Sequence, residues 1–268
     1  VAWTLHPIWP VVNDHILGDP DTDAIRGMWG LAHLRTSLLP PNTPLWSWQL
    51  NAPHGVLALV LPWTSGIMLA PIGALFGPLA GYNLGVAAMV WGGAMGTAWL
   101  VRATSGSWAA GAAAGACMIS QPMLLHAIGD GTPEHVAIWG IPVFLASAIE
   151  AVRRKSPAWG LAAGVIAIAV ALDSPYHAVY TLVVGVVVLP LVLITNLQRG
   201  RGADLALTIG AMGGATLLGA GLLAGLFRNF PIEEQVGLDA AALLDMNATD
   251  LYTWWQFDFG PDGERDAS

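Results

Sequence analysis

The amino-acid sequence predicts an all-α protein, a polytopic transmembrane helical bundle with juxtamembrane helices on its outer face. Of its 268 residues, 55% are hydrophobic and only 10% are charged, whereas about a quarter of the residues in a soluble domain are charged. The chain also contains 32 glycines and 13 tryptophans. Glycine lets helices approach closely in lipid, and tryptophan is enriched at the interface between membrane and water.

Six apolar segments account for the predicted bundle. A helix rises about 1.5 Å per residue, so about 20 residues cross a hydrocarbon core of about 30 Å. The fourth segment is short by this measure. The predicted spans are Tyr82–Ala103, Trp108–Ile128, His135–Val152, Ala158–Leu172, Tyr176–Leu197 and Ala203–Phe227.

The spans divide the chain into three regions. Residues 1–81 are predicted to form an outer acidic loop with juxtamembrane or re-entrant helices. Residues 82–229 form the six-helix transmembrane region, and residues 230–268 form an outer C-terminal segment. Within the spans, the glycine pairs Gly111/Gly115 and Gly160/Gly164 predict close packing between helices.

Basic residues lie in alternate loops and predict the orientation of the chain. Arg102 follows the first span, residues 153–155 (RRK) follow the third, and Arg199 and Arg201 follow the fifth. The positive-inside rule places these loops in the cytoplasm. The remaining loops, which carry most of the acidic residues, then face outside. We expect a multi-pass protein of the bacterial cytoplasmic membrane.

Two segments before the first span need separate treatment. Residues His54–Pro78 are apolar enough to span, but a crossing there would turn every basic loop outward. Because the segment contains three prolines, we expect a broken, re-entrant or interfacial pair of short helices. A surface helix is predicted over residues 24–39, capped by Thr22 or Asp23.

That surface helix is predicted to present one apolar side. Ile25, Met28, Trp29 and Ala32 fall roughly on this side, with Arg26 elsewhere. The helix would lie on the membrane surface, with acidic residues at the positive end of its dipole.

The acidic stretch "HILGDPDTDAIRGMWG" supplies the first candidate catalytic residues. Asp19, Asp21 and Asp23 place three carboxylates within five residues of a predicted outer loop. Carboxylates act as general bases and bind divalent cations. A solvated loop that caps the following helix explains the same residues, so both interpretations stand at this stage.

Two further outer loops carry polar side chains. "GDGTPEH" contains Asp130 and Glu134, and a carboxylate held so close to the membrane is costly unless it is used. The alternative is a turn with Glu134 near a helix start. "LDSPYH" contains Asp173, Tyr176 and His177, which could hold a phosphate or sugar. An interfacial tyrosine with a capping aspartate fits equally well.

Three isolated cationic or imidazole side chains complete the candidate substrate-binding residues: Arg26, His54 and Arg228. Arg228 follows the last span at the predicted outer face, where it could bind phosphate oxygens in a bidentate manner. The alternative for Arg228 is snorkelling to the interface. A lone histidine such as His54 is more often a structural hydrogen-bond donor.

The order of these parts resembles a known family. An acidic loop is followed by "NAPHG", a proline-broken apolar stretch ending "LFGPLAGYNL", and a span ending in arginine; an Ala/Gly-rich span ending "SQPMLLHAIGDGTPEH" comes next. This order resembles the membrane glycosyltransferases of the GT-C superfamily, especially bacterial relatives of the protein-mannosyltransferase and lipid A aminoarabinose-transferase type. The resemblance covers roughly residues 18–230.

The resemblance implies transfer of a sugar from a polyprenyl-phosphate carrier to an acceptor at the outer membrane face. It implies that one of Asp19, Asp21 and Asp23 serves as base, and that Asp130 or Glu134 is the family's second acid. The implied cofactor is a divalent cation, Mg²⁺ or Mn²⁺, and the implied partners are a lipid-linked sugar donor and membrane lipid. The chain shows no basic patch for nucleic acid.

Two further expectations follow. The family's first helix would lie upstream of Val1 and later spans would follow Ser268, so we expect this chain to be a fragment of a longer protein. The alternative function is a non-catalytic membrane scaffold or a transporter module. A transporter pathway needs charges buried in mid-span, and the predicted spans contain few acids apart from Glu150.

Overall fold

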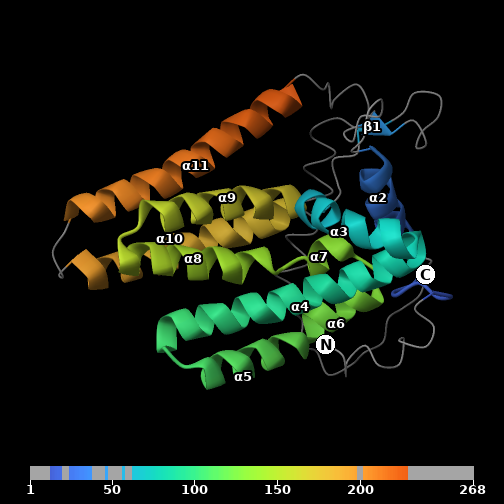
Figure 1. The fold of residues 1–268 in the computed structure, drawn as a ribbon, viewed down its shortest axis with the longest axis horizontal. Helices are drawn as coiled ribbons and strands as arrows, with labels where there is room; N and C mark the ends of the chain where they lie inside the picture. The colour runs from blue at the N-terminus through green and yellow to red at the C-terminus, as the bar shows by residue number, and fades with distance from the viewer. Residues whose placement is uncertain are drawn as a thin grey trace, which may run out of the picture. The chain divides into compact units, whose positions relative to one another are not determined.

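The protein is helical in the part of the chain that a computed structural model describes, which is residues 13–19, 24–37, 46–47, 56–57, 62–197 and 202–228 (Figure 1). Strands β1 (Trp46–Ser47) and β2 (Val56–Leu57) pair antiparallel over two residues. The all-α prediction is confirmed for the described residues.

Proline and glycine set many of the helix boundaries. Proline is the first residue of five helices, where its missing N–H is no loss, and Gly106 ends one helix in the left-handed conformation. The helices are α2 (Ala24–Ser37), α3 (Trp63–Phe76), α4 (Pro78–Ser105), α5 (Trp108–Ile119), α6 (Pro122–Gly129), α7 (Pro133–Val136), α8 (Gly140–Arg154), α9 (Pro157–Asp173), α10 (Pro175–Leu197) and α11 (Gly202–Arg228).

Four helical segments of the described chain are long and apolar enough to cross a membrane. They are Pro78–Ser105, Pro133–Arg154, Tyr176–Ile194 and Ala203–Leu222. Helices α5 and α6 together form a fifth only if counted as one span, because they bend by 44° before Pro122. All six predicted stretches are thus helical, but α9 has 17 residues, about 25 Å, and is shorter than a full crossing.

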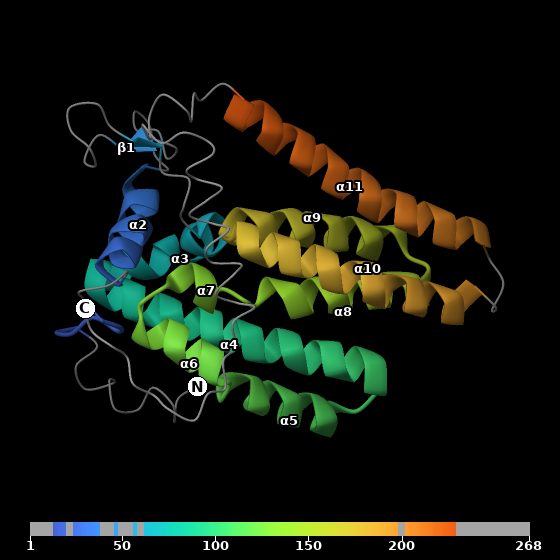
Figure 2. The ribbon, with the colours of Figure 1, turned by 180° about the vertical axis from the view of Figure 1, so that it is seen from behind.

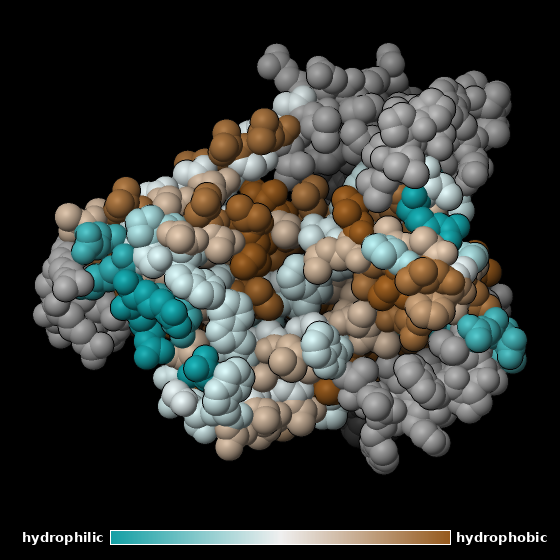
Figure 3. Space-filling view, viewed as in Figure 1, coloured by the Kyte–Doolittle hydropathy of each residue, from teal (hydrophilic) through white to brown (hydrophobic). Residues whose placement is uncertain are grey.

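The surface of these helices suits a lipid environment. Leu182, Val186 and Leu217 are 66%, 65% and 75% exposed, and brown hydrophobic surface spreads over the helical part of Figure 3. Apolar exposure on this scale is unusual for a soluble monomer. Several apolar helices therefore indicate a membrane protein.

Successive long helices run in opposite directions, so the turns that connect them fall into two sets (Figures 1 and 2). One set, which we call the basic end, contains Arg102 and residues 153–155, together with Glu150 and Asp204. The other set, the acidic end, contains residues 13–19, the α6–α7 turn and the α9–α10 turn. This is the alternation of loops that the sequence predicts.

Helix α3 differs from the prediction for residues 54–78. Among the described residues this stretch contains one helix rather than a pair, because Pro71 lies inside α3 without ending it, and Val56–Leu57 belongs to a strand. The break comes at Gly77, whose φ of +83° favours glycine. Fourteen residues span about 21 Å, which is too short to cross.

Helix α2 forms where it was predicted, and its predicted apolar side, which includes Ile25, is not the side that is buried in the protein. Ile25 is 52% exposed, whereas Ala24, Gly27 and Leu34 are buried against α3, α4 and their surroundings. A Cβ on Gly27 would lie 2.8 Å from the Pro133 ring. On the buried side, Ala24 and Gly27 therefore permit close approach, and the bulky side chain of Leu34 packs there as well. The predicted caps Thr22 and Asp23 lie outside the described residues.

Helix pairs pack through glycine, as the sequence predicts. A Cβ on Gly111 of α5 would lie 2.5 Å from the carbonyl oxygen of Ala98 in α4. A Cβ on Gly160 of α9 would lie 2.4 Å from the carbonyl oxygen of Thr208 in α11. Because both obstacles are backbone atoms, a larger residue at either position would separate the helices.

The loop alternation predicts which end is reached from outside the cell. In a Cys117→Ser background, which removes the exposed native thiol, Asp14→Cys should react with a membrane-impermeant maleimide in intact cells. Ser105→Cys at the basic end should react only after the membrane is permeabilised, because the arginines retain that end in the cytoplasm. Labelling of Ser105→Cys in intact cells would contradict this orientation.

Candidate functional site

The first acidic loop is attached to the bundle through Asn83. This side chain is 2% exposed in the second turn of α4. Its Oδ1 accepts a hydrogen bond from the Leu17 N–H (2.7 Å), and its Nδ2 donates to the His15 carbonyl oxygen (2.8 Å). Loss of these two hydrogen bonds would be costly for an amide that is buried to this degree. Asn83 therefore fixes the backbone two residues before Asp19.

A second contact joins the same loop to the α6–α7 turn. The Asp19 N–H donates to the Gly129 carbonyl oxygen at 2.7 Å. Gly18 and Gly131 both have positive φ, +105° and +70°, and a Cβ on Gly18 would lie 2.7 Å from the Gly131 Cα. The two chains thus meet backbone to backbone, which only glycine permits at such a distance.

These contacts bring two of the predicted acidic loops together. Asp19 is exposed, and its backbone bonds to the residue that precedes Asp130. Asp130 is 43% exposed in its side chain and lies 3.1 Å from His126 Nε2. Glu134 is half-buried in the short helix α7. Asp21 and Asp23, the other two predicted catalytic residues, lie outside the described residues.

The start of α10 lies beside α7. The Tyr176 ring contacts the His135 ring edge-on, with 5.7 Å between centroids. Tyr176 is 49% exposed, whereas His177 is 2% exposed and its Nδ1 has no hydrogen-bond partner among the described residues. Of the two predicted substrate-binding residues in α10, Tyr176 and His177, only Tyr176 therefore has an exposed side chain.

Asp173 has a structural role at a helix that is distant in the sequence. Its Oδ1 accepts from the Ser65 N–H (2.7 Å), and its Oδ2 accepts from Ser65 Oγ (2.7 Å) and Trp139 Nε1 (3.1 Å). Helix α3 begins after Pro62, which has no capping side chain. Asp173, at the end of α9, supplies the missing cap to the first turn of α3. Its carboxylate also lies at the positive end of the α3 dipole, where a negative charge is stabilised.

Burial changes the acidity of this carboxyl group. Asp173 is 3% exposed and follows the apolar stretch of α9, so desolvation raises its pKa from 3.8 to about 6. The hydrogen bonds from Ser65 and Trp139 act in the opposite direction and lower the pKa. Desolvation is the larger effect.

The remaining candidates are not placed in this site. His54 lies outside the described residues, and Arg26 and Arg228 belong to α2 and α11, with side chains that are not described. Among the residues that the structure describes, no three His, Cys, Asp or Glu side chains form a metal-binding group. Asp130 and Glu134 nevertheless supply the carboxylate oxygens that Mg²⁺ and Mn²⁺ prefer.

Comparison with protein-family models, curated proteins and solved structures finds no match.

Three residues that position the acidic end were not predicted from the sequence: Ser65, Asn83 and Trp139. Each sits in an apolar stretch, and its importance depends on a partner between 34 and 108 residues away. One signal was available: a helix whose N-cap position is Pro62 needs a polar group from elsewhere in the chain.

The raised pKa of Asp173 predicts a pH dependence of stability. Because the folded state holds this proton more tightly than the unfolded state, its contribution to stability is complete below pH 3.8 and is lost as the pH rises to about 6. Thermal unfolding in detergent should therefore show the wild type losing roughly 3 kcal/mol relative to Asp173→Asn across this window.

The control for this titration is Asp204→Asn, since Asp204 is exposed at the basic end. Its stability should follow that of the wild type at every pH. Parallel curves for wild type and Asp173→Asn would show that Asp173 does not titrate as its burial predicts.

Proposed function

We propose that this chain transfers a sugar from a polyprenyl-phosphate carrier to an acceptor at the outer membrane face. The resemblance to the GT-C superfamily suggests the reaction. The observation that supports it most is the attachment of the first acidic loop, through Asn83 and the Asp19–Gly129 hydrogen bond, to the turn that carries Asp130. Acidic residues from two separate loops therefore approach one another beside apolar helices.

In the proposed reaction a carboxylate of Asp19, Asp21 or Asp23 takes the proton of the acceptor hydroxyl. The acceptor oxygen then forms a bond to the anomeric carbon of the sugar. The bond from that carbon to the carrier phosphate breaks, and the phosphate leaves with the electron pair. General-base assistance of this kind typically contributes a hundredfold or more to the rate.

Other residues would bind the donor. Tyr176 is exposed beside His135 and can contact the sugar or carrier. His54, Arg26 and Arg228 are proposed to neutralise the phosphate. A divalent cation held by Asp130 and Glu134 would supply further charge neutralisation at the leaving group.

The apolar helices supply the location that such a donor requires. A polyprenyl chain is soluble in the bilayer, so its phosphate lies at the membrane surface. Segment Tyr176–Ile194, with a mean hydropathy of 2.4, begins directly at the acidic end. A carrier in the lipid could therefore present its phosphate beside Tyr176.

Substitution of the acidic loop tests this function. Asp19→Asn, Asp21→Asn and Asp23→Asn should separate into one severe and two milder variants, since one carboxylate takes the proton and its neighbours adjust it. The severe variant should lose about a hundredfold or more in sugar transfer from a polyprenyl-phosphate donor. Its thermal stability should change by less than about 0.5 kcal/mol, as at a surface position.

The matched control is Asp14→Asn, because Asp14 is exposed in the same described loop but precedes the residues held by Asn83. It should transfer sugar at the wild-type rate. If all three Asp variants match Asp14→Asn, the acidic loop is not catalytic and a membrane scaffold becomes the better interpretation.

A further inference from the structure

A hollow at the basic end contains arginines that the proposed reaction does not use. It has a volume of about 360 Å³ and is lined by Arg102, Gly106, Glu150, Arg153 and Arg154. The lining residues come from the last turn of α4, its cap, and the last turn of α8. A site of this size can hold a small ligand or a lipid headgroup.

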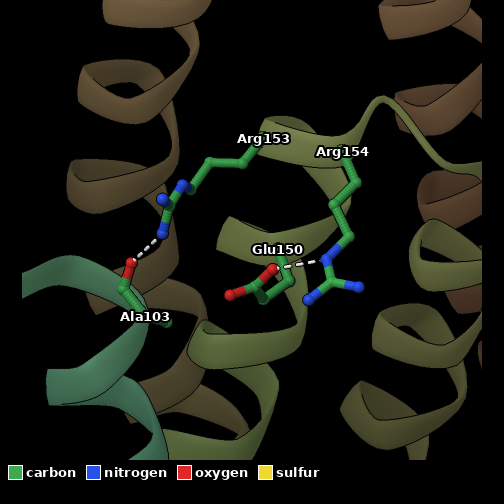
Figure 4. Close-up of polar contacts among 4 residues, drawn as sticks. All are labelled: Ala103, Glu150, Arg153 and Arg154. Carbon is green, nitrogen blue, oxygen red and sulfur yellow. Dashed lines mark hydrogen bonds and ion pairs between the residues drawn. The ribbon is translucent and has the colours of Figure 1, made fainter. Parts of the chain in front are cut away.

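The arginines are held in place by contacts that use few of their donors. Arg153 donates to the Ala103 carbonyl oxygen, and Arg154 Nε donates to Glu150 Oε2 at 2.6 Å (Figure 4). The Arg102 guanidinium lies 4.2 Å from the centre of the Trp108 ring. Each guanidinium has five N–H donors, so most of them remain available within the part of the chain that the structure describes.

The charge of the hollow favours an anion. Three guanidinium groups face one carboxylate, that of Glu150, which leaves a net charge of +2 among the lining residues. The C-terminal ends of α4 and α8 contribute about half a negative charge each and reduce this only in part. Glu150 is 7% exposed and fixes Arg154, so the positive charges are ordered rather than dispersed.

Tryptophans around the hollow point to the membrane interface. Trp108 lies under Arg102, and Trp159 lies 5.4 Å from Arg154 and 5.7 Å from Trp99, measured to ring centres. Tryptophan is enriched where lipid headgroups meet the acyl chains. Helices α4 and α8 both belong to segments long and apolar enough to cross a membrane. An arginine hollow beside tryptophans at the ends of such helices suits a lipid phosphate.

We propose that this hollow binds the phosphodiester of an anionic phospholipid headgroup. Arg102 and Arg154 can each present two parallel N–H groups to phosphate oxygens, and Trp108 and Trp159 border the headgroup. Free phosphate shares this chemistry, but the tryptophans that contact Arg102 and Arg154 favour a lipid source. The assignment is independent of the proposed sugar transfer, since it involves the opposite set of turns.

Native mass spectrometry of the detergent-solubilised protein tests the proposal. Short-chain phosphatidylglycerol, phosphatidylcholine and inorganic phosphate are titrated separately. The protein should retain phosphatidylglycerol in preference to phosphatidylcholine. Arg102→Gln should weaken retention about tenfold, because a charge-assisted bidentate contact is lost without leaving Glu150 unpaired. Retention by Arg102→Lys should fall between that of the wild type and that of Arg102→Gln, since lysine keeps the charge but cannot make the bidentate guanidinium contact.

For a second variant we expect tighter lipid binding, a result that a folding defect would not produce. Glu150→Gln raises the net charge of the lining to +3 and should tighten phosphatidylglycerol binding while its amide oxygen still accepts from Arg154. The control is Arg35→Gln, which removes an arginine in the last turn of α2, away from the hollow, and should leave retention unchanged.

Three results would overturn the proposal. The first is equal retention of phosphatidylglycerol and phosphatidylcholine. The second is wild-type retention in Arg102→Gln. The third is inorganic phosphate binding as tightly as phosphatidylglycerol, which would assign the hollow to a soluble anion.

Discussion

The arrangement of the acidic end depends on one buried amide. Asn83 is nearly inaccessible to solvent in α4, where an unpaired amide would be costly. Both of its polar atoms bond to the backbone of residues 15–17. The loop and the helix are therefore coupled: Asn83 holds the backbone at His15 and Leu17, and the Asp19–Gly129 hydrogen bond holds the same loop two residues later. Asp19 and its bond to Gly129 follow from this placement.

The rest of the bundle explains why a polar contact can have this influence. Between apolar helices in lipid, burial of apolar surface supplies little preference for one packing over another. Small residues and hydrogen bonds then select the packing. Gly111 and Gly160 set two close approaches between helices, while Ser65, Trp139 and Asp173 join α3, α9 and the segment before α8. At the acidic end such polar contacts act together with an apolar cluster against which Ile16 and Leu17 pack.

At the basic end, polar contacts also join helix ends, but there the side chains are arginines rather than carboxylates and an amide. Arg153 satisfies a carbonyl oxygen at the end of α4, and Arg154 neutralises the buried Glu150. These contacts stabilise the ends of α4 and α8. They also hold positively charged guanidinium groups close to the rings of Trp108 and Trp159. The two ends thus differ in charge because basic and acidic loops alternate along the chain. This alternation can be recognised in the sequence.

Much of the fold could be predicted from this sequence because hydropathy and glycine spacing are local properties. The six apolar stretches, the surface helix from Ala24 and the close approaches at Gly111 and Gly160 were all visible in the residues. The side of α2 that packs against α3 and α4 was not predicted, because two of its buried residues, Ala24 and Gly27, are small. Asp173 as a cap for α3 could not be predicted, since its partner Ser65 lies 108 residues away.

The candidate site was predictable to a smaller extent. The sequence placed acids in separate outer loops, but a list of acids does not say which loops meet. The meeting of residues 15–19 with the α6–α7 turn depends on Asn83 and on two glycines with positive φ, Gly18 and Gly131. None of these carries the chemistry, so reasoning from reactive side chains passes over them.

Hydrogen–deuterium exchange of residues 15–19 tests the central role of Asn83 most directly. The account predicts that the amides of Leu17 and Asp19 are protected in the wild type, since they donate to Asn83 Oδ1 and to the Gly129 carbonyl oxygen. In Asn83→Ala this protection should be lost, while α8 and α9 remain as protected as before. Rapid exchange at Leu17 and Asp19 in the wild type would contradict the account.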